Sequence, residues 1–253
     1  MNNELLIVAN WKMNISHDET FSFVTKHYDD LSKLAATTKH TVVLCPSFTT
    51  LYPLHNVLKD TPLKLGAQDC SNHIKGAFTG QVSAQSLKSL GCSYCIVGHS
   101  ERRKYNGETS EAVAQKASLL ISQGITPIIC IGENSSEYDQ GITLATLEQQ
   151  LAPVFAAFAG QCSRSVRTPL YIAYEPTWAI GTGNVPSHKH LEVVFSWLSA
   201  HTQKSCCPGI WKFLYGGSIT GQSAADIKKV SHVNGLLIGQ ASLDFQEFKK
   251  IVE

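Results

Sequence analysis

The sequence lacks any long apolar run. None of its apolar stretches approaches the roughly 18 to 20 residues that a membrane-spanning helix requires. The first residues, MNNELLIVANWKMN, also lack the basic start and the long apolar core of a secretion signal. We therefore expect a cytoplasmic protein with no membrane partner.

An excess of either charge is missing as well. The chain has 21 Lys and Arg residues against 20 Asp and Glu residues. A nucleic acid or an anionic membrane is usually bound through a strongly basic surface, and this balance gives no sign of one. We expect neither as a partner.

Cysteine is present without the pattern of a metal or redox centre. One C-x-x-C pair, Cys92 and Cys95, has no second pair or histidine at the spacing of a zinc site. In a chain of 253 residues with no secretion signal, the eight cysteines are expected to be reduced thiols that serve packing. We assign no catalytic role to Cys206 and Cys207, which lie in a polar stretch.

Short apolar runs alternate with amphipathic segments along the chain. Nearly continuous apolar character is typical of strands that are covered on both faces. The predicted strands are Leu5–Asn10, Thr41–Cys45, Leu63–Gln68, Tyr94–Gly98, Thr126–Gly132, Leu170–Glu175, Phe213–Gly217 and Gly235–Gly239.

The segments between these strands predict helices. Ser110–Gln123, Leu144–Phe158 and His188–His201 have apolar residues three and four positions apart. Eight strand–helix units in 253 residues fit the α/β class, as a closed (β/α)8 TIM barrel that forms one domain over residues 1–253. An open doubly wound sheet is the alternative, but its glycine-rich fingerprint is missing after Asn10.

Such a barrel places catalytic side chains at the C-terminal ends of its strands. Glu175 ends one predicted strand, where partial desolvation makes a carboxylate a stronger base. The following residues, 176–183, are too apolar for an ordinary exposed loop and run from a proline to a glycine. They predict a rigid lid that excludes water from the site.

Other strand ends carry groups for proton transfer and for anion binding. His99 can donate a proton to a carbonyl oxygen and take it back, and Lys12 supplies a cation at the same mouth. Glycines in residues 216–218 and at position 239 follow the last two strands. Glycine lets backbone N–H groups approach a phosphate closely, so these positions predict a phosphate site.

In these motifs and their order, the chain resembles the triosephosphate isomerase family over essentially its whole length. The motifs that carry the resemblance are NWKMN from Asn10, GAFTG from Gly76, GHSERR from Gly98, CIGE from Cys130, AYEP from Ala173, WAIGTG from Trp178 and YGGS from Tyr215.

The resemblance implies an isomerase of glycolysis and gluconeogenesis that interconverts dihydroxyacetone phosphate and D-glyceraldehyde 3-phosphate through an enediolate. Glu175 would be the base, and His99 would move protons between the two oxygens. Lys12 and Asn10 would stabilise negative charge, with Glu101 near Lys12 as an orienting group. The reaction only relocates protons, so we expect neither a metal nor an organic cofactor.

The resemblance also implies how the substrate is enclosed and how subunits assemble. Backbone N–H groups of Gly181, Ser218, Gly239 and Gln240 would bind the phosphate. The lid would consist of Pro176, Thr177, Trp178, Ala179, Ile180, Gly181 and Thr182. We expect a homodimer in which Thr79 lies close to the partner's Asn14 and the partner's His99.

Three positions depart from the family pattern. Gln240 stands where a second glycine is usual, and its side chain either crowds the phosphate or, as we favour, points to solvent. Asn184 replaces a lysine at the far end of the lid. Gln81 replaces a glutamate that would face Arg102 across the interface, so we expect Glu108 of the same chain to pair with Arg102 instead.

Two other functions stay open from the sequence. A barrel enzyme that acts on an indole or amino-sugar phosphate would share the phosphate site but would not need Asn10, Lys12, His99 and Glu175 together. A catalytically silent barrel used in adhesion would tolerate the loss of His99 or Glu175, and both are present.

Overall fold

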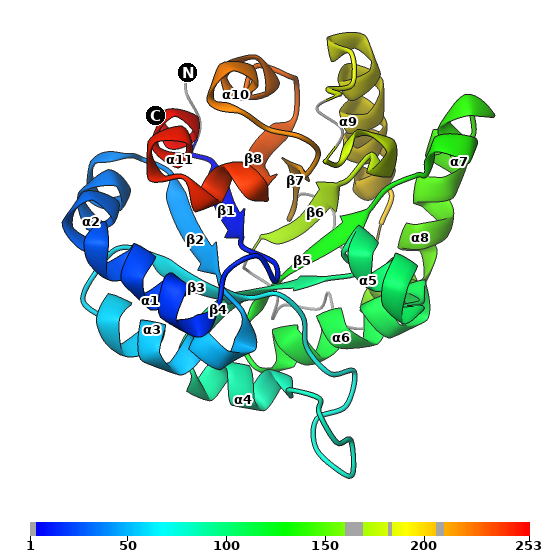
Figure 1. Cartoon of the computed structure of the whole chain (residues 1–253). Coiled ribbons are helices and arrows are strands. Elements are labelled where there is room, and N and C mark those ends of the chain that lie inside the picture. Colours follow the sequence, from blue (N-terminus) through cyan, green and yellow to red (C-terminus); the bar gives the residue numbers. More distant parts are fainter. Residues whose placement is uncertain (1–3, 160–168, 182–183, 206–209) are drawn as a thin grey trace.

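Eight parallel strands close into a barrel in their order along the chain. The computed structural model describes residues 4–159, 169–181, 184–205 and 210–253. In these residues β1 pairs with both β2 and β8, and helices surround the ring of strands (Figure 1). The predicted (β/α)8 class is confirmed.

The strands are β1 (Leu6–Asn10), β2 (Thr41–Cys45), β3 (Lys64–Ala67), β4 (Cys92–Val97), β5 (Thr126–Ile131), β6 (Leu170–Tyr174), β7 (Trp211–Tyr215) and β8 (Val233–Ile238). The α-helices are α1 (His17–Lys26), α2 (Tyr28–Thr37), α3 (Leu51–Leu58), α4 (Ala84–Ser89), α5 (Ser100–Asn106), α6 (Ser110–Ser122), α7 (Ser135–Asp139), α8 (Thr143–Phe158), α9 (His188–Gln203), α10 (Gly221–Ile227) and α11 (Phe245–Val252). Short 3-10 helices are η1 (Phe48–Thr50), η2 (Thr177–Ala179) and η3 (Gln240–Leu243).

The predicted strands agree with the structure to within two residues at each end. Six of the eight predicted strands extend one or two residues too far at the C-terminal end, where for example Gly98, Glu175 and Gly239 fall just outside their strands. The chain leaves the strand conformation there and turns into the mouth of the barrel. Gly98, for example, has a φ of 71°, a left-handed value that no strand residue adopts.

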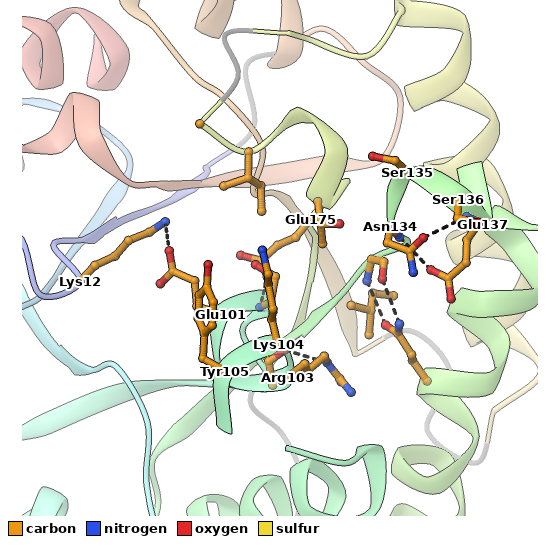
Figure 2. Close-up of a pocket in the computed structure, with 18 residues that line it drawn as sticks. Lys12, Glu101, Arg103, Lys104, Tyr105, Asn134, Ser135, Ser136, Glu137 and Glu175 are labelled. Atoms are coloured by element: carbon orange, nitrogen blue, oxygen red, sulfur yellow. Dashed lines mark hydrogen bonds and ion pairs between the residues drawn. The ribbon is translucent and has the colours of Figure 1, made fainter. Parts of the chain in front are cut away.

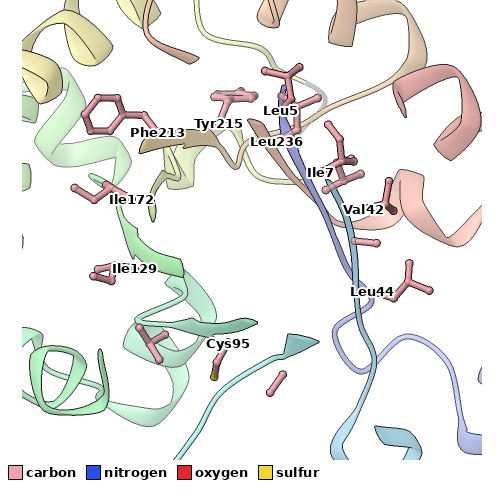
Figure 3. Packing of buried hydrophobic residues seen from close by; sticks show 14 of the residues in the cluster. Leu5, Ile7, Val42, Leu44, Cys95, Ile129, Ile172, Phe213, Tyr215 and Leu236 are labelled. Carbon is pink, nitrogen blue, oxygen red and sulfur yellow. The ribbon is translucent and has the colours of Figure 1, made fainter. Parts of the chain in front are cut away.

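Side chains of each strand alternate between two buried clusters. Leu6 and Val8 belong to a cluster that fills the barrel, whereas Ile7 and Ala9 belong to the larger cluster between strands and helices. Figure 3 shows Ile7 and other members of the larger cluster pointing from the strands toward the surrounding helices. Burial on both faces explains why the strands are continuously apolar.

The described cysteines pack in these clusters. Cys45, Cys70, Cys92, Cys95 and Cys130 are buried free thiols. Burial raises the pKa of Cys92 to about 12, so its thiol stays protonated and unreactive near neutral pH. Cys162, Cys206 and Cys207 lie outside the described residues.

The described part of the chain has neither a candidate metal cluster nor a candidate membrane-spanning helix. No three His, Cys, Asp or Glu side chains there are grouped so that they could hold a metal ion. Its helices also include none that is long and apolar enough to cross a bilayer.

The seam between β1 and β8 should not tolerate a side chain at Gly235. A Cβ there would lie 2.0 Å from the Leu6 carbonyl oxygen. We expect Gly235→Ala to lower the free energy of unfolding by at least about 3 kcal/mol in urea denaturation. Gly141→Ala is the control, since its Cβ would meet no atom within 4 Å and would cost only about 1–2 kcal/mol for its left-handed backbone. Equal losses would contradict the prediction.

Candidate active site

Residues at or after the C-terminal ends of β1, β4, β5 and β6 line a cavity of about 890 Å³. Figure 2 shows Lys12, Glu101 and Glu175 facing this space. Ile180 and Gly181 of the predicted lid also line it. Side chains that are far apart in the sequence thus meet at the rim that the barrel fold favours for catalysis.

Lys12 is held in an unusual backbone conformation. Its φ of 52° is left-handed, which is rare for a residue with a side chain. Its N–H donates to Asn10 Oδ1 at 3.1 Å, and its carbonyl accepts a hydrogen bond from Gln68 Nε2 at 2.8 Å. These bonds fix the turn after β1, and Lys12 Nζ lies 2.7 Å from Glu101 Oε1.

His99 is buried at the start of α5. Its Nδ1 accepts a hydrogen bond from the Glu101 backbone N–H at 3.2 Å. Because Nδ1 is an acceptor, the proton of the neutral ring is assigned to Nε2. That nitrogen lies 3.0 Å from Glu175 Oε1, so neutral His99 presents a donor to the interior of the site.

Glu175 is almost fully buried, with 1% of its surface exposed. Its Oε2 accepts a hydrogen bond from the Ser100 N–H at 2.9 Å. Two glycines leave room for it. A Cβ at Gly216 would lie 2.9 Å from Glu175 Cγ, and a Cβ at Gly132 would lie 1.8 Å from the Glu175 carbonyl oxygen. The position of Glu175 therefore depends on the close approach of three neighbouring strand ends.

Glu175 and His99 shift each other's pKa. Burial raises the pKa of Glu175, but His99, the Ser100 N–H and Lys12 outweigh it and leave the pKa below its ordinary value. Burial lowers the pKa of His99, and the Glu175 carboxylate raises it by more. The rise depends on that contact. Once the carboxylate moves to a substrate, burial and Lys12 favour the neutral imidazole.

The beginning of the predicted lid is fastened to Glu133, which follows β5. The Thr177 N–H and Oγ1 both donate to the Glu133 carbonyl at 3.0 Å. Trp178 Nε1 donates to Glu133 Oε1 at 2.8 Å. From the other side, Ser218 Oγ donates to the Ala179 carbonyl at 2.6 Å. The lid therefore rests on groups from two further strand ends.

The residues predicted to bind phosphate lie around the same rim. Gly181 lines the cavity with a φ of 71°. A Cβ at Gly239 would lie 3.4 Å from Lys12 Cε, so the end of β8 is beside the lysine. Gln240 begins η3 with an exposed side chain, the arrangement favoured from the sequence. Thr182, the last predicted lid residue, lies outside the described residues.

Arg102 does not pair with Glu108, and that expectation was wrong. Its Nη2 lies 2.9 Å from Asp69 Oδ2. Both oxygens of Glu108 are already engaged, because Oε2 accepts from the Gly98 N–H at 3.0 Å and Oε1 contacts Lys116 Nζ. Lys116 Nζ also lies 2.7 Å from Asp69 Oδ1, so one network links all four charged side chains.

The other residues predicted for a subunit interface lie on the surface or near it. Thr79 and Gln81 are exposed, and Gln81 Oε1 accepts a hydrogen bond from Ser71 Oγ at 2.5 Å. Asn14 Nδ2 donates to the Trp11 carbonyl at 3.0 Å. The segment that carries Thr79 extends away from the barrel as a long loop between β3 and α4 (Figure 1).

Gln150 supports the site and was missed in the sequence. From α8 its Oε1 accepts from the Gly132 N–H and its Nε2 donates to the Gly132 carbonyl, both at 2.9 Å. The preceding carbonyl, of Ile131, accepts from the Glu175 N–H at 2.7 Å. Gln150 thus fixes the strand end against which the Glu175 backbone packs. No motif marks this amide, because its partner is a backbone group 18 residues away.

This arrangement suits proton transfer at a carbon next to a carbonyl group. A buried carboxylate can take the proton, an adjacent Nε2–H can serve the carbonyl oxygen, and a lysine can stabilise the negative charge that develops. Ile180 and Gly181 of the predicted lid line the same cavity, and a glycine N–H can approach an anionic group closely.

Comparison with known proteins identifies relatives along almost the whole chain. The family model described as triosephosphate isomerase matches residues 5–253. The protein of that name from Endomicrobium trichonymphae is 38% identical over 252 residues, which cover 98% of this chain and 97% of the relative. The one from Aquifex aeolicus (strain VF5) is 37% identical over 254 residues, covering 98% of each. The one from Mycobacterium tuberculosis (strain CDC 1551 / Oshkosh) is 38% identical over 261 residues, covering 98% and 95%.

The pKa of His99 should fall when Glu175 loses its charge. The Glu175 carboxylate favours the protonated ring, so Glu175→Gln removes the larger of the two acidic contributions that raise this pKa. NMR titration of the His99 ring in both proteins measures the change. Glu101→Gln is the comparison, and it should shift the pKa in the same direction by less. An unchanged His99 pKa in Glu175→Gln would contradict the described pairing.

Proposed function

The chain belongs to the triosephosphate isomerase family, and we propose that the residues around its cavity carry out the family's reaction. The chain is an isomerase of glycolysis and gluconeogenesis. It interconverts dihydroxyacetone phosphate and D-glyceraldehyde 3-phosphate by moving a proton between neighbouring carbons through an enediolate.

Glu175 is the base in this proposal. The observation that carries it is the buried pair in which Glu175 Oε1 lies 3.0 Å from His99 Nε2, beside a cavity lined by Lys12. Both carboxylate oxygens face groups of the protein itself, since Oε2 accepts from the Ser100 N–H. When substrate binds, the carboxylate gives up these partners and turns to the carbon-bound proton of the substrate. It then abstracts that proton in a site shielded from water.

His99, Lys12 and Asn10 act on the substrate oxygens. Neutral His99 donates from Nε2 to the carbonyl oxygen and recovers a proton from the other hydroxyl as the enediolate resolves. Lys12 stabilises the negative charge on oxygen and phosphate. Asn10 supports the turn that carries Lys12, because Asn10 Oδ1 accepts a hydrogen bond from the Lys12 N–H. Glu101 orients Lys12 Nζ through their 2.7 Å contact.

Backbone groups at the rim bind the phosphate, and the lid closes over it. Gly181, Ser218, Gly239 and Gln240 provide the N–H groups, and the cation of Lys12 lies beside Gly239. Residues 176–182 shield the enediolate from water while it exists. This assignment is supported by the apolar character of the segment and by the position of Ile180 and Gly181 along the cavity.

We further propose that residues 1–253 act as a single catalytic domain, in the cytoplasm, as a homodimer. The exposed loop with Thr79 supports the dimer, because it extends away from the barrel and leaves Thr79 open to contact from another molecule (Figure 1). In a two-fold symmetric pair each such contact occurs twice.

Glu175→Gln should keep the fold and lose the activity. The amide has the size of the carboxylate but cannot accept the proton, and general base catalysis contributes roughly 10²–10⁴-fold. Turnover of D-glyceraldehyde 3-phosphate in a coupled assay should fall by at least that factor, whereas the surface variant Glu111→Gln should be unaffected. Turnover above about a tenth of the native value in Glu175→Gln would rule Glu175 out as the base.

Position 81 should control the strength of the dimer. Gln81 can accept a hydrogen bond from an arginine of the partner subunit, but a carboxylate would also form an ion pair with it and could accept two parallel hydrogen bonds. We expect the Gln81→Glu dimer to dissociate at a lower protein concentration than the native dimer. Its dissociation constant should fall on the order of tenfold for each 1.4 kcal/mol of added binding free energy. Analytical ultracentrifugation to nanomolar concentration measures this, with Gln222→Glu on α10 as a control of equal charge. Identical dissociation of native protein and Gln81→Glu would remove the role of this position.

A further inference from the structure

A line of hydrogen bonds connects α9 with the lid. His190, near the start of α9, has its Nε2 2.8 Å from Tyr174 Oη at the end of β6. Tyr174 Oη donates to Glu133 Oε1 at 2.9 Å. The same oxygen accepts from Trp178 Nε1 at 2.8 Å. The lid tryptophan and the histidine are therefore joined through one carboxylate oxygen and one hydroxyl, both deeply buried.

The number of protons fixes the direction of these bonds. The Tyr174 hydroxyl has one proton, and it donates that proton to Glu133. Burial raises the pKa of Tyr174, and Glu133 adds to the rise, so the hydroxyl keeps its proton. His190 Nε2 is then the donor to Tyr174 Oη, because an oxygen that has already given its proton can only accept. The neutral ring is thereby assigned its Nε2–H tautomer.

The surroundings of His190 keep the ring in this state. Its ring makes T-shaped contacts with the rings of Tyr138 and Trp178, whose centroids are 5.3 Å and 6.1 Å away. Burial lowers the pKa of His190, and Glu133, whose Oε1 lies 3.9 Å from Nε2, raises it by less. The imidazole is therefore neutral near pH 7 and acts as a hydrogen-bond donor and a packing surface.

We propose that His190 is a positioning residue for the lid. Its Nε2–H directs the lone pairs of Tyr174 Oη, which leaves the hydroxyl proton aimed at Glu133. Glu133 Oε1 then stays where the Trp178 indole can reach it, and Trp178 carries the lid segment that ends in Gly181. His190 touches neither the substrate nor the reacting atoms. This inference rests on the proposed function of residues 176–182 as a lid that binds the substrate phosphate.

Loss of the His190 donor should loosen the lid anchor and weaken phosphate capture. His190→Leu keeps an apolar side chain against Tyr138 and Trp178 but cannot donate to Tyr174. We expect kcat/KM for D-glyceraldehyde 3-phosphate to fall roughly two- to tenfold, the effect of one net hydrogen bond, mainly through a higher KM. His190→Gln places an amide donor near the Nε2 position and should restore most of the loss.

Hydrogen exchange reports on the lid itself. The Ala179 and Ile180 amides donate within the lid, to the Pro176 and Thr177 carbonyls. Their exchange should be faster in His190→Leu than in the native protein and normal in His190→Gln. The control is His188→Leu on the same helix, whose side chain is exposed and lies near Glu192 rather than the anchor. It should change neither the kinetics nor the exchange.

A double-mutant cycle tests whether His190 acts through Tyr174. If it does, His190→Leu combined with Tyr174→Phe should lose no more than the worse single variant. Additive losses would overturn the proposal, as would kinetics and lid exchange in His190→Leu that match those of His188→Leu. If His190→Leu fails to fold, His190→Gln and Tyr174→Phe decide by the same measurements, with a deficit expected only in Tyr174→Phe.

One measurement separates this inference from the proposed lid. Glycerol 3-phosphate carries the phosphate of the substrate and no carbonyl group, so it probes closure without reaction. Bound glycerol 3-phosphate should slow hydrogen exchange of the lid amides in the native protein. If it does not, both the lid and the role of His190 fail. If it does, and His190→Leu behaves as the native protein, only the role of His190 fails.

Discussion

The hydrogen-bonded seam between β1 and β8 is the constraint on which the site depends. The pairing runs from Leu6 opposite Gly235 to Ala9 opposite Ile238. It brings the residues after both strands to one rim, so Lys12 and Gly239 become neighbours although they come from opposite ends of the chain. An open sheet would leave β1 and β8 at separate edges. Closure therefore brings a cation next to the turn that we propose binds phosphate, two groups that no local sequence pattern could bring together.

Two buried glutamates, Glu133 and Glu175, lie side by side at this rim with different hydrogen-bond partners. Carboxylates in such places need donors, because burial without them is costly. Glu133 receives two side-chain donors, Trp178 and Tyr174, and serves as a fixed anchor. Glu175 is held by one backbone N–H and by its proximity to His99, partners that it can exchange for a substrate. The register of β5 and β6 sets both residues next to each other, since Ile131 lies opposite Tyr174.

The sequence was most informative where physics acts locally. Continuous apolar runs located all eight strands, and turn glycines marked the rim, because both depend on nearby residues. Pairing between distant side chains was harder to foresee. Glu108 was expected beside Arg102, but nothing in the sequence revealed that Lys116 and the Gly98 N–H already occupy it. Likewise, Gln150 and His190 look like ordinary helix residues until the fold brings them against Gly132 and Tyr174.

The cavity has consequences for ligand design, because it is larger than a three-carbon substrate requires. Beyond Glu101 and Glu175 it continues along α5 past Lys104 and Tyr105 to Ser136 on α7 (Figure 2). An inhibitor whose phosphate occupies the proposed site near Gly181 could be lengthened toward these residues. There it would meet an ammonium group, an aromatic ring and a hydroxyl rather than the reacting groups. Potency and selectivity can then be tuned on separate parts of one molecule.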